Sequence, residues 1–154
     1  MAVDRWLPWE ELLDRAGIIL LILDQEGRIL RVNESGARLL GASPQELIGR
    51  DWFADFVSSQ GELELRRVFS ATLGRGTAHV NTVRSLAGEE RTIVWRNAPL
   101  PEPGTGVVAL GIDITDRIRL EEKLKAAVED AERRLNRLTA LRQIDKSIIA
   151  SRSL

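Results

Sequence analysis

Two short apolar segments, separated by a polar turn, begin the regular pattern of this chain. Residues 18–23 read Ile-Ile-Leu-Leu-Ile-Leu, a run that suits a strand covered on both faces. Residues 24–27 (Asp-Gln-Glu-Gly) have the composition of a turn, in which Gly27 supplies the positive φ angle. Residues 28–32 return as a second strand, so the pattern predicts a β-hairpin.

Helix start signals follow the hairpin. Asn33 is a suitable N-cap for a helix over residues 33–40, because its side chain can accept a hydrogen bond from the first turn. Residues 43–46 (Ser-Pro-Gln-Glu) have the form of a capping box with proline in the first turn, which predicts a second short helix ending near Gly49.

The second half of the pattern contains one longer helix and three strands. An aromatic cluster at residues 52–57 precedes a helix that the apolar spacing predicts over residues 62–73. Three extended segments then follow, at residues 77–86, 90–100 and 107–112. Two strands, several helices and three strands in this order favour an α+β fold, in which an antiparallel sheet carries helices on one face.

The N-terminal residues 1–15 predict a short amphipathic helix, with Trp6, Trp9, Leu12 and Leu13 three or four residues apart. Such a helix must bury its two tryptophans. Docking on the sheet of the same chain is one interpretation, and an additional contact with a second copy is the other.

The C-terminal segment, residues 116–154, has apolar residues at alternating steps of four and three, a heptad pattern. This seam consists of Leu124, Val128, Ala131, Leu135 and Leu138. Oppositely charged pairs four residues apart, such as Glu121 with Lys125 and Asp130 with Arg134, flank it. The narrow seam favours a parallel two-stranded coiled coil, and the alternative is a helix that folds back on its own domain.

Composition narrows the classes of function. The net charge of −1 provides no general attraction for nucleic acid, and no apolar run approaches the length of a membrane helix. The chain has no cysteine, which excludes disulfides, thiolate metal sites and cysteine nucleophiles. We expect neither a metal site nor a catalytic constellation, and we expect a cytoplasmic protein that is not an enzyme.

From about Leu12 to Thr115 the chain resembles a PAS domain. The matching features are the first strand with its turn, Asn33 with Ala37 and Gly41, the segment 43–49, Gly88, Pro99 and Asp113-Ile114-Thr115. The resemblance implies an N-terminal helix (1–15), a PAS domain (16–115) with a five-stranded antiparallel sheet and helices around a cavity, and a C-terminal signalling helix (116–154). Residues 138–154 resemble the helix that leads into a GAF domain, which is absent here.

The resemblance implies a sensor and dimerisation module of a signalling protein, such as a two-component histidine kinase or a cyclase. A signal in the cavity would shift the sheet, and Asp113, Ile114 and Thr115 would pass that shift to a coiled coil that controls an absent output domain. Asp113 and Thr115 would tie strand to helix by hydrogen bonds. The residues themselves also suit a simple helix start, with Thr115 as its N-cap.

Candidates for the cavity wall are Trp52, Phe69, Trp95 and Asn97. Trp95 and Asn97 point to the same side of one strand. In some PAS domains such a pair faces a flavin bound without a covalent link, so a redox or light sensor is the alternative function. We expect no cofactor, with Trp95 in ordinary packing or on the outer face of the sheet near Trp6 or Trp9. The single histidine, His79, is expected to be a structural or surface residue.

Overall fold

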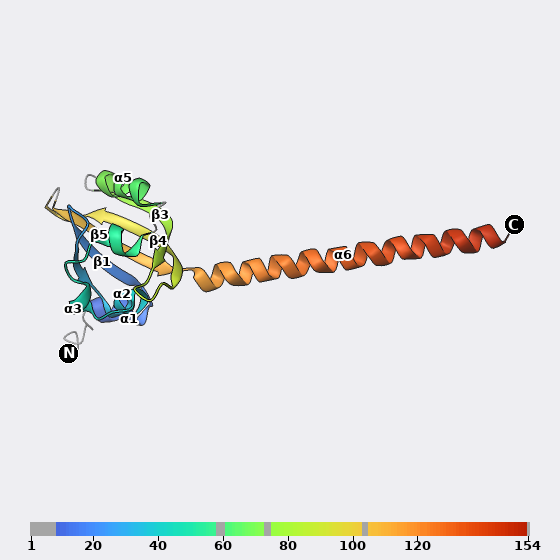
Figure 1. Ribbon diagram of the computed structural model, residues 1–154, viewed down its shortest axis with the longest axis horizontal. Coiled ribbons are helices and arrows are strands. Elements are labelled where there is room, and N and C mark those ends of the chain that lie inside the picture. Colours follow the sequence, from blue (N-terminus) through green and yellow to red (C-terminus); the bar gives the residue numbers. More distant parts are fainter. Residues whose placement is uncertain (1–8, 58–60, 73–74, 103–104, 154) are drawn as a thin grey trace, which may run out of the picture. The chain divides into compact units, whose positions relative to one another are not determined.

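The computed structural model describes residues 9–57, 61–72, 75–102 and 105–153, and the chain forms two compact units that divide after Thr115. The first unit contains the sheet and its helices (Figure 1). Its elements are α1 (Trp9–Arg15), β1 (Ile19–Asp24), β2 (Ile29–Val32), α2 (Glu34–Leu40), α3 (Pro44–Leu47), α4 (Trp52–Phe56), α5 (Glu62–Thr72), β3 (Thr77–Arg84), β4 (Glu90–Pro99) and β5 (Gly106–Asp113). The second unit is the remainder of α6 (Thr115–Arg152).

The five strands form one antiparallel sheet in the order β2-β1-β5-β4-β3. The fold is therefore α+β, as the order of elements in the sequence predicts. The hairpin between β1 and β2 closes through Gly27, whose φ angle is 85°. β3 is an edge strand whose ladder pairs with β4, and on its other side Val83 forms an isolated bridge with Val57.

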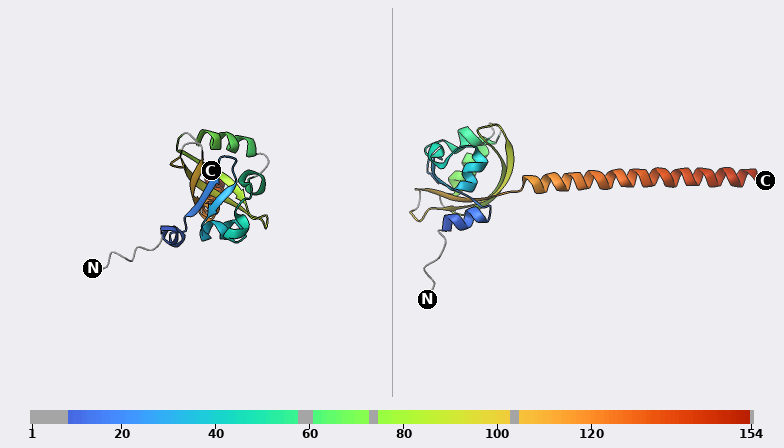
Figure 2. Two further views of the ribbon diagram at one scale, coloured as in Figure 1. Left: turned by 90° about the vertical axis from the view of Figure 1, so that its left-hand side faces the viewer. Right: turned by 90° about the horizontal axis from the view of Figure 1, so that it is seen from below.

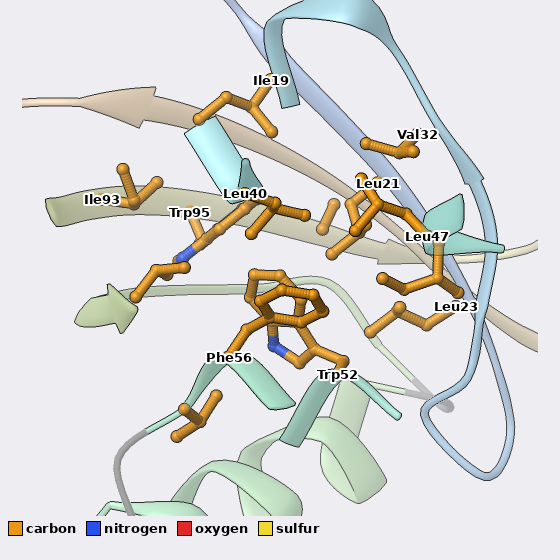
Figure 3. Close-up of a cluster of buried hydrophobic side chains, with 14 of the residues drawn as sticks. Ile19, Leu21, Leu23, Val32, Leu40, Leu47, Trp52, Phe56, Ile93 and Trp95 are labelled. Atoms are coloured by element: carbon orange, nitrogen blue, oxygen red, sulfur yellow. The ribbon is translucent and has the colours of Figure 1, made fainter. Parts of the chain in front are cut away.

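The core lies between the sheet and the helices α2 to α5 (Figures 2 and 3). Ile19, Leu21 and Leu23 alternate along β1 and point into this core. Leu40 and Leu47 enter from α2 and α3, and both are at most 1% exposed. Burying side chains of this size removes the largest apolar areas from water, so this layer is the main source of stability.

Helix starts in this layer are fixed by side chains. Asn33 is buried, and its Oδ1 accepts hydrogen bonds from Gly36 N (3.1 Å) and from Leu20 N (2.8 Å). The predicted N-cap therefore also ties α2 to β1. Glu46 Oε2 accepts from Ser43 N (2.9 Å) and Ser43 Oγ (2.7 Å), as expected for the predicted capping box of α3.

The expected burial of the N-terminal tryptophans is not observed for Trp9. Its side chain is 53% exposed on α1, and the guanidinium of Arg31 lies 5.7 Å from its ring centroid. Trp6 lies outside the described residues. Asp14 attaches α1 to the domain, because its Oδ1 accepts a hydrogen bond from Ser35 N (2.8 Å) at the start of α2.

The aromatic cluster after Gly49 forms a helix that the sequence pattern did not predict. Asp51 is the N-cap of α4, and its Oδ1 accepts from Phe53 N (2.9 Å) and Ala54 N (3.1 Å). This cap stabilises a helix of five residues, which is too short for a periodic signal.

The helix α6 is continuous over 38 residues. Every residue of the predicted seam is exposed in the single chain, and Leu124, Leu135 and Leu138 are each at least 59% exposed. Among the helices of the described residues, none combines the length and apolar character needed to cross a bilayer.

Candidate functional site

A small cavity of about 30 Å³ lies between the sheet and the helices α4 and α5. Its volume is enough for roughly two water molecules. The wall is apolar except for one imidazole and one amide. It is lined by Leu21, Leu23, Trp52, Phe53, Leu65, Phe69, His79, Trp95, Asn97, Val107 and Ala109.

All four residues proposed from the sequence for the cavity wall line this cavity. Trp52 of α4 meets Trp95 of β4 edge to face, with ring centroids 5.5 Å apart. Phe69 of α5 meets Phe53 in the same way at 5.3 Å. Trp95 is 2% exposed and faces the helices (Figure 3), so the suggestion that it lies on the outer face of the sheet is wrong.

Asn97 and His79 form the polar part of the wall. Asn97 Nδ2 lies 3.3 Å from His79 Nδ1, within hydrogen-bonding distance. Asn97 Oδ1 is buried and has no hydrogen-bond partner in the described part of the chain. A buried acceptor without a partner is uncommon and marks a place where a ligand or a water molecule can bind.

His79 was expected to be a structural or surface residue, and the structure places it in the wall of the cavity. His79 pairs with Trp95 in the antiparallel register of β3 and β4, so the two side chains share one face of the sheet. Knowledge of this register would have been enough to place the imidazole beside Asn97.

Burial lowers the pKa of His79 below its ordinary value of 6.5. The unfolded chain therefore binds a proton at higher pH than the folded chain, and the free energy of unfolding falls as the pH decreases below about 6.5. We expect His79→Gln to reduce this loss of stability on acidification. Urea unfolding of both proteins between about pH 5 and 8 measures it. Identical pH profiles for the two proteins would mean that His79 titrates normally in the folded state.

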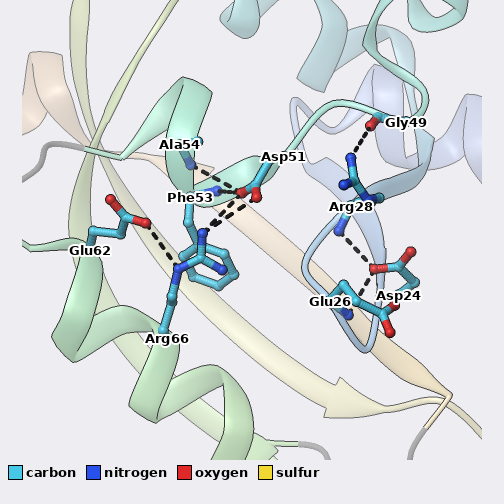
Figure 4. A network of polar contacts seen from close by, with 9 residues as sticks. All are labelled: Asp24, Glu26, Arg28, Gly49, Asp51, Phe53, Ala54, Glu62 and Arg66. Carbon is cyan, nitrogen blue, oxygen red and sulfur yellow. Dashed lines mark hydrogen bonds and ion pairs between the residues drawn. The ribbon is translucent and has the colours of Figure 1, made fainter.

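The helix α5 is attached over the cavity by Arg66 (Figure 4). Arg66 Nε lies 3.0 Å from Glu62 Oε1, Arg66 Nη2 lies 3.4 Å from Asp51 Oδ1, and the guanidinium carbon lies 4.6 Å from the Phe53 ring centroid. Partial burial disfavours the charged form of Asp51. The hydrogen bond from Ala54 N–H and the charge of Arg66 outweigh this effect, so the pKa of Asp51 is lowered below 3.8. These contacts connect α5 to the N-cap of α4.

The end of α5 is also joined to the sheet, by a hydrogen bond between two threonine hydroxyl groups. The hydroxyl groups of Thr72, at the end of α5, and Thr77, at the start of β3, lie 2.6 Å apart. Thr72 is fully buried. The end of α5 and the edge strand are therefore linked directly, on the side of the sheet that also carries His79.

The exit residues form a compact set of hydrogen bonds at the end of β5. Asp113 Oδ1 accepts from Thr115 N (2.8 Å) and from Thr115 Oγ1 (2.5 Å). Thr115 Oγ1 accepts from Thr92 N of β4 (2.8 Å), and Ile114 N donates to Thr92 O (2.9 Å). The prediction that the Thr115 side chain is the N-cap is wrong, because its hydroxyl bonds to β4 and Asp113 accepts from the first turn instead.

An arginine that the sequence interpretation did not consider also reaches the exit. Arg91 Nη1 of β4 lies 3.6 Å from Asp113 Oδ2, and Arg91 also pairs with Glu89. The carboxylate of Asp113 is therefore held from β4 as well as from the start of α6.

In the described part of the chain, no group of three or more His, Cys, Asp or Glu side chains could hold a metal ion.

Comparison with known proteins places these features in context. The sequence profile of the family described as PAS fold matches residues 13–119. None of the curated proteins matches the chain at a significant level.

Several solved structures share the fold. The PAS domain of the Cronobacter turicensis RpfR quorum-sensing receptor, solved in complex with BDSF and in complex with C12:0, is 27% identical with a TM-score of 0.58, over 64% of this chain and 95% of that one. A PAS domain from Colwellia psychrerythraea is 19% identical with a TM-score of 0.58, over 69% of this chain and 93% of that one. A domain of an HTR-like protein from Haloarcula marismortui is 23% identical with a TM-score of 0.52, over 64% of this chain and 99% of that one.

Proposed function

The chain belongs to the PAS family, and on this premise we propose that it senses a small molecule in its cavity and relays binding through Asp113, Ile114 and Thr115 to α6. In this proposal α6 pairs with a second copy along the seam as a parallel coiled coil. The paired helices then control an output domain of the full-length signalling protein, such as a histidine kinase. The module itself has no catalytic role, and it acts in the cytoplasm.

One observation carries the proposal: the same strand forms both the cavity wall and the exit. Trp95 and Asn97 of β4 line the cavity, and Thr92 of β4 makes two hydrogen bonds to the exit residues. A displacement of β4 by a ligand would change the geometry at Thr115 without any intermediate element. Coupling through one packed, hydrogen-bonded element is a short and physically continuous route.

The occupant is proposed from the wall and from one relative. The apolar wall suits a small organic molecule with little charge. The RpfR domain, solved in complex with BDSF and in complex with C12:0, supports only that a PAS domain can hold a small organic molecule. We carry over to this chain only that a small organic ligand occupies the space between sheet and helices.

A flavin is less well supported as the occupant. Trp95 and Asn97 do face the cavity, and the free Asn97 Oδ1 could accept a hydrogen bond from the flavin ring. The cavity of about 30 Å³, however, would have to enlarge much more for three fused rings than for a small organic molecule. Absorption in the blue by the purified protein would favour the flavin sensor.

We test the relay by filling the cavity with a side chain. Ala109 lines the cavity opposite Asn97 on β5, so Ala109→Leu places three carbon atoms where a ligand would lie. We expect the amide hydrogen of Thr92 to exchange several-fold faster or slower than in the parent, because its hydrogen bond to Thr115 is disturbed. Hydrogen exchange followed by NMR measures this, with Gly41 N–H, which donates to Ala37 O at the end of α2 away from the cavity, as the reference.

The matched control is Ala98→Leu, which adds the same atoms to the exposed outer face of β4. It should leave the exchange of the Thr92 amide unchanged. Equal exchange rates at Thr92 in both variants, after correction for Gly41, would refute the relay through β4.

A further inference from the structure

The amide of Asn97 determines which hydrogen-bonding groups the cavity offers. Its Nδ2 lies beside His79 Nδ1, and an amide nitrogen can only donate. With the amide in this orientation His79 Nδ1 is the acceptor, which corresponds to the neutral ring with its proton on Nε2. Burial favours the same neutral form, since it lowers the pKa of His79.

Asn97 Oδ1 is a buried acceptor that has no partner in the described part of the chain. Leaving a buried acceptor unpaired costs free energy, and a group that brings a donor to it removes that cost. A carboxylate brings no donor, and its oxygen atoms would be repelled by the carbonyl oxygen of the amide.

Within the described residues, no charged side chain lines the cavity to offset a ligand's charge. Arg66 lies over the Phe53 ring, which lines the cavity, and is already paired with Asp51 and Glu62. Transfer of an unpaired carboxylate into such surroundings is strongly unfavourable. The free acceptor at Asn97 Oδ1 and the lack of a lining charge among the described residues therefore both disfavour an anion beside this atom.

We infer that the cavity binds an uncharged molecule with an apolar body and a hydrogen-bond donor, such as a carboxamide or a hydroxyl, and that Asn97 Oδ1 accepts from this donor. The inference rests on the proposed function, since it assumes that the cavity binds a ligand. Entry requires α5 to yield. The residues that α5 contributes to the wall, Leu65 and Phe69, are only partly buried.

Three rigid probes of nearly the same shape test the inference on the full chain. Benzamide has a donor, benzoate has a negative charge in its place, and toluene has neither. We expect benzamide to bind at least about tenfold more tightly than benzoate at neutral pH, because one unpaired polar group corresponds to a factor of this order. Chemical shifts of the Trp95 and Asn97 side-chain N–H groups locate the probes in the cavity and give the affinities.

The variant Asn97→Leu separates hydrogen bonding from packing. It removes the acceptor, so the affinity for benzamide should fall about tenfold while the affinity for toluene stays the same or rises. A role of Asn97 in packing alone would change both affinities equally. That result would overturn the assignment of Asn97.

The remaining outcomes are distinct from one another. If benzoate binds to the parent protein as tightly as benzamide, the inference about ligand charge is wrong, while the proposed ligand site stands. If no probe shifts the cavity resonances at its solubility limit, Asn97 Oδ1 is bonded to water alone. In that case the cavity is not a site for such ligands, and the proposed function fails with the inference.

Discussion

Replacing Leu135 with aspartate is expected to convert a dimer of the intact chain into a monomer. Leu135 is 64% exposed on α6 and is the fourth of the five seam residues, so a second helix is the partner that would cover it. Burial of a leucine contributes about 1.5–3 kcal/mol, and the dimer contains two copies. The dissociation constant should therefore rise by at least about 100-fold, before any cost of burying the new charge is added.

Sedimentation of the intact chain and two variants measures this effect. Asn136→Asp is the matched control, because it adds the same charge one residue away from the seam and should leave association unchanged. Truncation after Thr115 should act like Leu135→Asp and leave the sheet domain folded. An intact chain that stays monomeric at high micromolar concentration would refute the coiled coil. Equal dimerisation of all variants would place the contact in the sheet domain.

The second large effect is expected at Gly111, where an alanine should destabilise the domain by about 1–3 kcal/mol. A Cβ atom at this position would lie 2.6 Å from Trp95 Cζ3 and 2.9 Å from Ile93 Cγ2. Both neighbours are at most 2% exposed, so neither can move aside freely. Urea unfolding of the parent and of Gly111→Ala gives the difference in free energy.

A double-mutant cycle identifies the cause. If the indole of Trp95 is the obstacle, Gly111→Ala should cost less in a Trp95→Leu background, with a coupling energy of about 0.5–3 kcal/mol. Additive effects of the two substitutions would show that the methyl group meets the backbone or Ile93 instead. The position of the Trp95 indole would then not require a glycine at position 111.

The sequence predicts the parts of this fold that local chemistry determines. The hairpin at Gly27 and the helix start at Asn33 occur where expected, since one positive φ angle and one side-chain cap define them. Alternation along β4 also predicts that Trp95 and Asn97 share a face. It does not say which face, because that depends on pairing with β5 and on the space above Gly111, both set by distant residues.

The ion pairs on the exposed surface of α6 could be predicted from the sequence only in part. The expected pair of Asp130 with Arg134 is present at 2.8 Å, but Glu121 pairs with Arg117 at 2.9 Å rather than with Lys125. Long side chains on a solvated helix choose among partners whose energies differ by a few tenths of a kcal/mol. Such pairs describe the surface and do not determine the partner of the helix.

The place of β3 at the edge of the sheet sets how the cavity can enlarge. Displacing β4 would break two hydrogen-bonded ladders, whereas displacing β3 breaks one ladder and the bridge between Val83 and Val57. Because the hydroxyls of Thr72 and Thr77 join α5 to this strand, a displacement of β3 would carry the end of α5 with it and would strain the contacts of Arg66 with Asp51 and Phe53. In such an opening His79 would move with β3 and Asn97 would stay with β4, so the hydrogen bond between them would break.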